Sequence, residues 1–155
     1  MEIHTASTPR QWTDVERLIR AYLDDLPFEI DFQDLDRELV ALPTEYGPPE
    51  GAALVVVDDG GFAVGIVGVR RFDERSAELK RMYLAPEARG MGMGRALGAA
   101  AVAAARDLGY ERLLLDTVAT MTAAIATYRA LGFVEIAPYR HNPLPDARFF
   151  ALDLT

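Results

Sequence analysis

The chain has 155 residues, half of them hydrophobic, which is enough for one domain with a buried core. Its formal net charge of −8 argues against nucleic acid or an anionic membrane surface as the main partner and favours a cationic one. The sequence contains no cysteine, which excludes disulfides, cysteine-bound zinc and an acyl-cysteine intermediate. Residues 1–7 show no cleavable signal and no apolar run reaches the length of a membrane span, so we expect a single cytoplasmic domain over residues 1–155.

The first third of the chain predicts one strand, two helices and a loop. A short strand is expected at residues 2–6, and Thr8-Pro9 then supplies an N-cap and a proline at the first helical position. The helix that follows, 9–24, carries apolar residues at three- and four-residue steps. A second helix is expected at about residues 34–42, and the prolines of 43–51 favour a loop there.

The middle of the chain changes to the two-residue period of β-strands. Two β-branched runs at 53–57 and 62–72 flank the hairpin sequence Asp58-Asp59-Gly60-Gly61. A second turn at 73–76 leads into the alternating run 78–84. We therefore expect three strands in an antiparallel meander.

The last third predicts alternating helices and strands. An alanine-rich helix is expected at residues 95–108, followed by a strand at 112–118. Because a strand, helix and strand in succession form a right-handed crossover, the strands 78–84 and 112–118 should pair in parallel. The remaining predicted elements are a helix at 122–131 and strands at 133–137 and 147–154.

A glycine-rich loop joins the strand 78–84 to the helix behind it. Gly90, Gly92 and Gly94 stand at every second position, so the backbone can bend sharply and point several N–H groups into one concavity. Together with the positive end of the following helix, this arrangement predicts a site for an anion such as phosphate. The alternative is a glycine turn that only closes the strand on the helix.

The spacing of these glycines decides between kinds of phosphate loop. The sequence fits neither the G-x-G-x-x-G pattern of dinucleotide-binding loops nor the Gly-Lys-Ser/Thr ending of a P-loop. The pattern Arg-x-x-Gly-x-Gly at residues 89–94 instead resembles the coenzyme A pyrophosphate loop of the GNAT superfamily of N-acetyltransferases.

A second motif extends the resemblance over essentially the whole chain. Residues 124–133 read AIATYRALGF, which is similar to the A-x-x-x-Y-x-x-x-G-F pattern of the same superfamily. The resemblance implies an α/β (α+β) GNAT fold, with a mixed, mostly antiparallel seven-stranded sheet, a splayed parallel central pair and about four flanking helices. One position departs from the family: many members carry Asn seven residues before Tyr128, where this chain has Met121.

The resemblance also implies a reaction, the direct transfer of an acetyl group from acetyl-CoA to a primary amine in a ternary complex. Such a transfer needs a neutral amine, a polarised carbonyl and a proton for the departing thiolate. Glu78 matches the position of the family's general base and would act directly or through water; the alternative is a strand carboxylate that pairs with Lys80 or Arg81. Tyr128 matches the thiolate-protonating tyrosine; the alternative is a core aromatic residue.

The same resemblance implies that three segments bind the coenzyme: the end of the central strand, the glycine loop and the start of the last helix. The Met82 N–H would polarise the thioester oxygen. The residues assigned to acetyl-CoA are Met82, Tyr83, Leu84, Arg89, Gly90, Met91, Gly92, Met93, Gly94, Arg95 and Met121.

The acceptor amine is expected to enter between the first two helices and the C-terminal loop. That region offers aromatic walls, a carboxylate for a cation and a guanidinium for a carboxylate, which suits an amino acid or similar zwitterion. The candidate residues are Tyr22, Phe28, Glu29, Phe32, Tyr139, Arg140 and Asn142. His4 and His141 lack partners at metal-ligand spacing, so no metal is expected.

Several functions stay open on the sequence alone. The favoured one is a small-molecule N-acetyltransferase with acetyl-CoA and a small amine as partners, without nucleic acid or membrane. A catalytically silent acyl-CoA-binding or sensing domain, an acetyltransferase of protein N-termini or lysines, and a plain interaction domain are the alternatives. A homodimer is also left open.

Overall fold

The structure is a computed structural model that describes residues 1–28 and 32–155, with the side chains of Phe32 and Gln33 outside the description. No helix in these described ranges is long and apolar enough to cross a membrane. The elements, in chain order, are β1 (Glu2–Thr5), α1 (Pro9–Asp25), α2 (Phe32–Val40), α3 (Leu42–Glu45), β2 (Ala52–Val57), β3 (Ala63–Arg71), β4 (Ser76–Leu84), η1 (Pro86–Ala88), α4 (Met93–Asp107), β5 (Arg112–Val118), α5 (Thr122–Ala130), β6 (Val134–Ile136) and β7 (Ala147–Asp153).

Helix α1 begins where the sequence predicts. The Thr8 hydroxyl accepts a hydrogen bond from the Gln11 N–H at 3.2 Å, and the Gln11 side chain accepts one from the Thr8 N–H at 3.0 Å. This reciprocal pair satisfies two N–H groups that the helix itself cannot bond. Pro9 occupies the first turn, where its missing N–H costs nothing.

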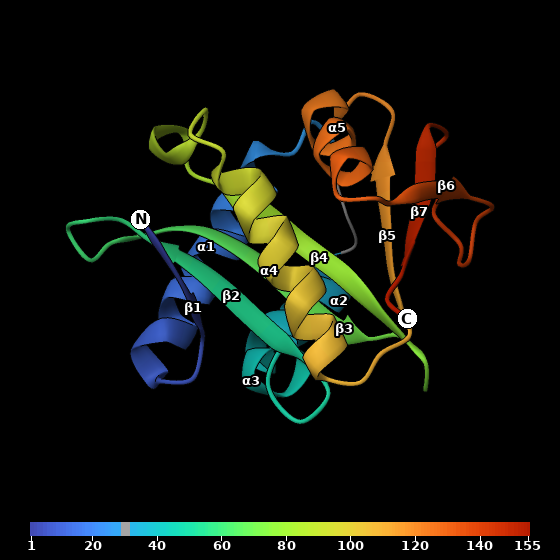
Figure 1. The fold of residues 1–155 in the computed structure, drawn as a ribbon. Coiled ribbons are helices and arrows are strands. Elements are labelled where there is room, and N and C mark those ends of the chain that lie inside the picture. The colour runs from blue at the N-terminus through green and yellow to red at the C-terminus, as the bar shows by residue number, and fades with distance from the viewer. Residues whose placement is uncertain (29–31) are drawn as a thin grey trace.

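The seven strands form one sheet in the order β1-β2-β3-β4-β5-β7-β6. All neighbours are antiparallel except β4 and β5, which pair in parallel over Ser76–Glu78 and Arg112–Leu114. Beyond that short ladder the two strands run apart toward Leu84 and Val118 (Figure 1). The predicted mixed sheet with a splayed parallel pair is therefore confirmed.

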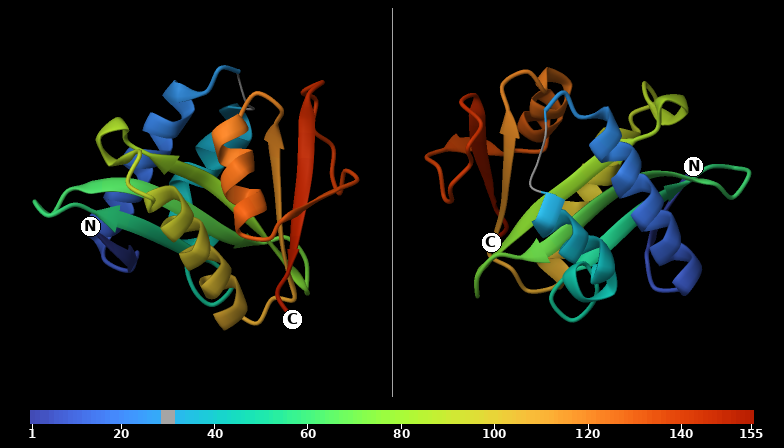
Figure 2. Two further views of the ribbon diagram at one scale, coloured as in Figure 1. Left: turned by 45° about the horizontal axis from the view of Figure 1, so that its top comes forward. Right: turned by 180° about the vertical axis from the view of Figure 1, so that it is seen from behind.

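Helices cover both faces of the sheet. Figure 1 shows α4 lying across one face, and the view from behind in Figure 2 shows α1, α2 and α3 on the other. Strand β2 contributes side chains to the hydrophobic cores on both faces of the sheet. Leu54 and Val56 pack with α4 and α5, while Ala53 and Val55 pack with α1, α2 and α3. The divergence of β4 and β5 opens the sheet between these two cores, and that opening holds the candidate site.

The described residues contain five α-helices, where the sequence predicted four and a loop at 43–51. The prediction of a loop is wrong for residues 43–45, because Pro43 lies in the first turn of α3, a position that needs no N–H. Tyr46 follows the helix and is fully buried against Gly68, at which a Cβ atom would lie 2.5 Å from the tyrosine ring. The helix predicted at 34–42 is α2, which ends at Val40, and the helix predicted from residue 95 is α4, which begins at Met93.

Candidate active site

Two adjoining cavities occupy the opening between β4 and β5. The larger, about 490 Å³, reaches the loop after β6, and the smaller, about 350 Å³, reaches the end of β4 and Arg89. Cavities of this size and position are typical of small-ligand sites. The residues that line both are Tyr22, Leu26, Met82, Met121, Ala124 and Tyr128.

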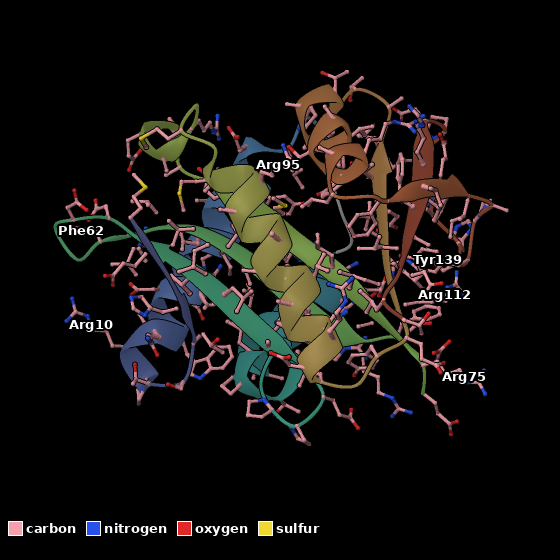
Figure 3. All side chains as sticks on the ribbon, viewed as in Figure 1. Arg10, Phe62, Arg75, Arg95, Arg112 and Tyr139 are labelled. Atoms are coloured by element: carbon pink, nitrogen blue, oxygen red, sulfur yellow. The ribbon has the colours of Figure 1, made fainter. Side chains whose placement is uncertain are left out.

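The glycine loop provides the geometry of an anion site next to the smaller cavity. Gly90 and Gly92 have φ angles of +80° and +77°, which only glycine adopts without strain. A Cβ atom at either would meet no heavy atom within 4 Å, so this edge of the loop is open to a ligand. The N–H groups of the first turn of α4 lack intrahelical partners and lie at the same end, which Arg95 marks in Figure 3. These features fit a pyrophosphate.

Arg89 ties the loop to its surroundings. Its Nε donates to the Leu84 carbonyl at 2.9 Å, and its Nη2 lies 3.2 Å from the carboxylate of Asp25 at the end of α1. The guanidinium also stacks over the Tyr83 ring, with its carbon 5.7 Å from the ring centroid. Arg89 therefore links α1, the end of β4 and the glycine loop, and it lines the smaller cavity with Met82, Tyr83 and Leu84.

Tyr128 stands where the two cavities meet. Its ring is buried in α5 and packs against Phe133 with the ring centroids 5.8 Å apart. Burial raises the pKa of the Tyr128 hydroxyl well above its ordinary value, so the group stays protonated at neutral pH. A protonated hydroxyl at this junction is able to donate a proton to a group in either cavity. Its role as catalytic acid stays a prediction.

Glu78, the predicted base, is only 2 % exposed and is absent from the residues that line the two cavities of the described structure. Its Oε2 accepts a hydrogen bond of 2.7 Å from the Tyr139 hydroxyl and lies 3.7 Å from Arg140. Its Oε1 lies 3.8 Å from Arg70. These contacts hold Glu78 in place behind the cavity wall, so its role as base stays a prediction, with a water-mediated route favoured over a direct one.

Asp116 on β5 is a candidate that the sequence reasoning missed. It lines the larger cavity, and its Oδ2 accepts hydrogen bonds from Arg140 Nε at 3.3 Å and Asn142 Nδ2 at 3.1 Å. In the described part of the chain no hydrogen bond reaches its Oδ1, which leaves that oxygen for a ligand. The signal was a lone carboxylate in the otherwise apolar strand RLLLDTV.

A β-bulge in β4 changes what the cavity presents. Arg81 has a φ of +59°, and the register between β3 and β4 shifts between Ile66 and Gly68. Consequently Lys80 and Arg81, which simple alternation would place on opposite faces, both line the larger cavity. Arg81 there donates to the Glu38 carboxylate of α2 at 2.9 and 3.0 Å.

The other predicted acceptor residues divide into three groups. Tyr22, Phe28, Arg140 and Asn142 line the larger cavity, and their contact with an acceptor stays a prediction. Tyr139 instead lines neither cavity of the described structure; its hydroxyl contacts Glu78, and its ring packs edge-to-face against Phe149 of β7 with the ring centroids 5.4 Å apart. Glu29 and the side chain of Phe32 fall outside the described residues. Within the described ranges, no three acidic or histidine side chains gather as a metal site would require.

Comparisons with known proteins agree with this geometry. The family model described as "Acetyltransferase (GNAT) family" matches residues 12–133. An uncharacterised N-acetyltransferase of Schizosaccharomyces pombe is 34 % identical, over 100 % of this chain and 96 % of that protein. The N-acetylaspartate synthetase of Homo sapiens is 33 % identical over 83 % of this chain, which corresponds to 40 % of the human protein.

A solved structure shows the same fold at lower sequence identity. A GNAT superfamily phosphinothricin acetyltransferase from Sinorhizobium meliloti, crystallised in complex with AcCoA, superimposes with a TM-score of 0.70 at 20 % identity, over 98 % of this chain and 87 % of that one. The family match spans both motifs and the two diverging strands β4 and β5. The chain belongs to the GNAT family of acetyltransferases.

Proposed function

We propose that this chain is an acetyl-CoA-dependent N-acetyltransferase that acts on the primary amine of a small molecule, an amino acid, in a ternary complex. The observation that carries the proposal is the position of Tyr128 at the junction of two cavities, one reaching the end of β4 beside the glycine loop and the other lined by charged side chains. We take residues 1–155 as one catalytic domain.

Acetyl-CoA supplies the reactive acyl thioester, and the smaller cavity is the side from which we propose it enters. The N–H groups of the glycine loop and of the first turn of α4 would hold its pyrophosphate. The backbone of Met82–Leu84, where β4 leaves β5, would hold the amide arm, as the family resemblance implies. The structure of the Sinorhizobium meliloti relative with AcCoA supports this assignment at the level of the fold.

Proton transfer is divided between the two cavities in this proposal. Tyr128 gives its hydroxyl proton to the departing thiolate; its raised pKa keeps the hydroxyl protonated until that thiolate forms beside it. Glu78 takes the proton of the acceptor ammonium through a water molecule, because its carboxylate lies behind the cavity wall. Asp116 Oδ1, which accepts no hydrogen bond from a described residue, holds the ammonium in place.

The acceptor enters through the larger cavity. Tyr22 and Phe28 offer aromatic walls, and Asn142 and Arg140 lie at the C-terminal loop. The human relative is named for the synthesis of N-acetylaspartate, an acetylated amino acid, which supports an amino acid as acceptor.

The test is the release of CoA thiol from acetyl-CoA in the presence of an amine panel that contains amino acids, polyamines, aminoglycosides and peptides with free N-termini. We expect thiol release with amino acids and none with buffer alone. Acetyl-CoA binding by calorimetry without release on any amine would identify a silent acyl-CoA-binding domain. Release on peptides alone would identify a protein acetyltransferase.

A further inference from the structure

Lys80 differs from every other basic residue of the chain. It is the only lysine, since 15 of the 16 basic residues are arginines. It is 8 % exposed, yet it lines both the larger cavity and a neighbouring one of about 360 Å³ between β4 and α2. A buried ammonium aimed into a cavity needs a partner, because an uncompensated charge is costly away from water.

The arginines that surround this lysine already hold carboxylates. Arg81 lies 2.9 Å and Arg70 lies 3.2 Å from Glu38, and Arg140 lies 3.2 Å from Asp116. The ammonium of the lysine, in contrast, makes neither a hydrogen bond nor an ion pair with any residue that the structure describes. It is therefore the cation at which a ligand's negative charge would be compensated.

The charges around the cavity leave room for one more anion. Four cations, Lys80 with the three arginines, are matched by three carboxylates of low exposure: Glu38 and Glu78, which are buried, and Asp116, which is 10 % exposed. Asp34 and Arg37 also line these cavities, but they form an exposed ion pair of 2.9 Å with each other. Glu45 is 41 % exposed at the rim and lies 3.7 Å from Arg70. An acceptor with one ammonium and two carboxylates has a net charge of −1 and would balance the buried set.

We propose that Lys80 binds a carboxylate of the acceptor and that the acceptor is an amino acid with a second carboxylate, an amino dicarboxylate. The proposal rests on the acetyltransferase function proposed above. The ammonium of the acceptor lies at Asp116 and its side-chain carboxylate at Lys80. The chain's overall charge of −8 favours a cationic partner, but the short-range charges of the cavity outweigh it, because charges beyond about 10 Å are screened by salt.

The electrostatics of the lysine agree with this geometry. Burial is the largest influence and lowers the pKa of Lys80, Glu78 and Asp116 raise it, and Arg140 and Arg70 lower it; together they bring the pKa to about 8. At pH 7 the group is still mostly charged. A carboxylate bound beside it would stabilise the ammonium and raise its pKa.

The kinetic test uses acceptor pairs that differ only in a carboxylate, aspartate with asparagine and glutamate with glutamine. We expect the wild type to prefer the dicarboxylates by about 10- to 100-fold in kcat/KM, as for a hydrogen bond to a charged group. Lys80→Met should abolish this preference by raising KM for the dicarboxylates, while kcat/KM for asparagine and glutamine stays unchanged. Lys80→Arg should retain part of the preference. Arg10→Met, at an exposed site on α1 on the other side of the molecule from Tyr139 (Figure 3), is the matched loss of charge and should change nothing.

A second readout does not depend on turnover. Because the chain has one lysine, growth on lysine labelled with ¹³C at Cε yields a single side-chain NMR signal. Its pH titration should give a pKa near 8 in the free protein, and a higher value with aspartate or succinate but not with asparagine.

The outcomes separate the two proposals. Acetyl transfer without a dicarboxylate preference, or a Lys80→Met loss that is equal on all amines, overturns the role of Lys80 and leaves the acetyltransferase function standing. A lysine signal that responds to succinate in a protein that acetylates no amine supports the carboxylate site and overturns the acetyltransferase function.

Discussion

The exchange of Glu78 for glutamine tests how the acceptor amine loses its proton. The glutamine side chain has nearly the same shape and keeps an oxygen that can accept the 2.7 Å hydrogen bond from Tyr139. Arg70 and Arg140 lose one contact each but keep Glu38 and Asp116, respectively. We therefore expect a folded variant with unchanged acetyl-CoA affinity and a slower reaction.

The size of the effect follows from the amine. A primary amine with a lysine-like pKa of about 10.4 is neutral in roughly one molecule per thousand at pH 7.4, and a general base contributes about 10²- to 10⁴-fold. We expect Glu78→Gln to lower kcat about 100- to 1000-fold at pH 7.4. The loss should shrink by roughly tenfold per pH unit as the free amine deprotonates by itself.

Steady-state kinetics between pH 6.5 and pH 10, with thermal unfolding and acetyl-CoA calorimetry as controls, measure this directly. Asp116→Asn is the matched variant, because it neutralises the other carboxylate near the acceptor and should act mainly on KM. A wild-type rate in Glu78→Gln, together with a pH-dependent loss of kcat in Asp116→Asn, would refute the reasoning and make Asp116 the base.

Three further variants test other parts of the site. Tyr128→Phe should lower kcat about 100-fold or more while calorimetry finds acetyl-CoA affinity within about twofold, because only the proton donor is lost; an unchanged kcat would contradict its role as acid. Gly92→Val should weaken acetyl-CoA binding at least tenfold, since a β-branched residue at φ +77° is strained by about 1–2 kcal/mol. Gly94→Ala, with its Cβ 3.7 Å from Leu84, is the control and should bind acetyl-CoA normally. Equal acetyl-CoA affinities of the two variants would rule out the loop as the binding site. Burial raises the pKa of Glu38, but the hydrogen bonds from Arg81 outweigh burial and lower the pKa below its ordinary value. The Glu38–Arg81 pair should therefore stabilise the fold above about pH 4.3, and this contribution should be lost as the pH falls below that value. Unfolding midpoints in Glu38→Gln that fall in parallel with those of the wild type on acidification would contradict this.

The fold was largely predictable because its signals are local. Thr8 marks the start of α1, and the apolar run 112–118 marks β5 to the residue. The parallel pairing of β4 with β5 follows from chain order and handedness. The start of α4 was placed two residues late, because Met93 and Gly94 read as part of the glycine loop in the sequence.

The candidate site was predictable only where a motif marks it. Tyr128 and the glycine loop lie in recognisable patterns. The bulge at Arg81 has no such signal, because no glycine stands at that position and the shift arises from the pairing of β4 with β3. The roles proposed for Lys80 and Asp116 depend on this bulge and on the divergence of the strands, which are tertiary features.

The central claim, that an acetyl group crosses from one cavity to the other, is tested most directly by following the label of ¹³C-acetyl-CoA. Wild-type protein is incubated with the coenzyme and aspartate, and mass spectrometry locates the label. The account predicts that the label appears on the amino nitrogen of the acceptor at a rate equal to thiol release. Label that stays in the coenzyme, or that appears as acetate at the same rate with and without an amine, would contradict it.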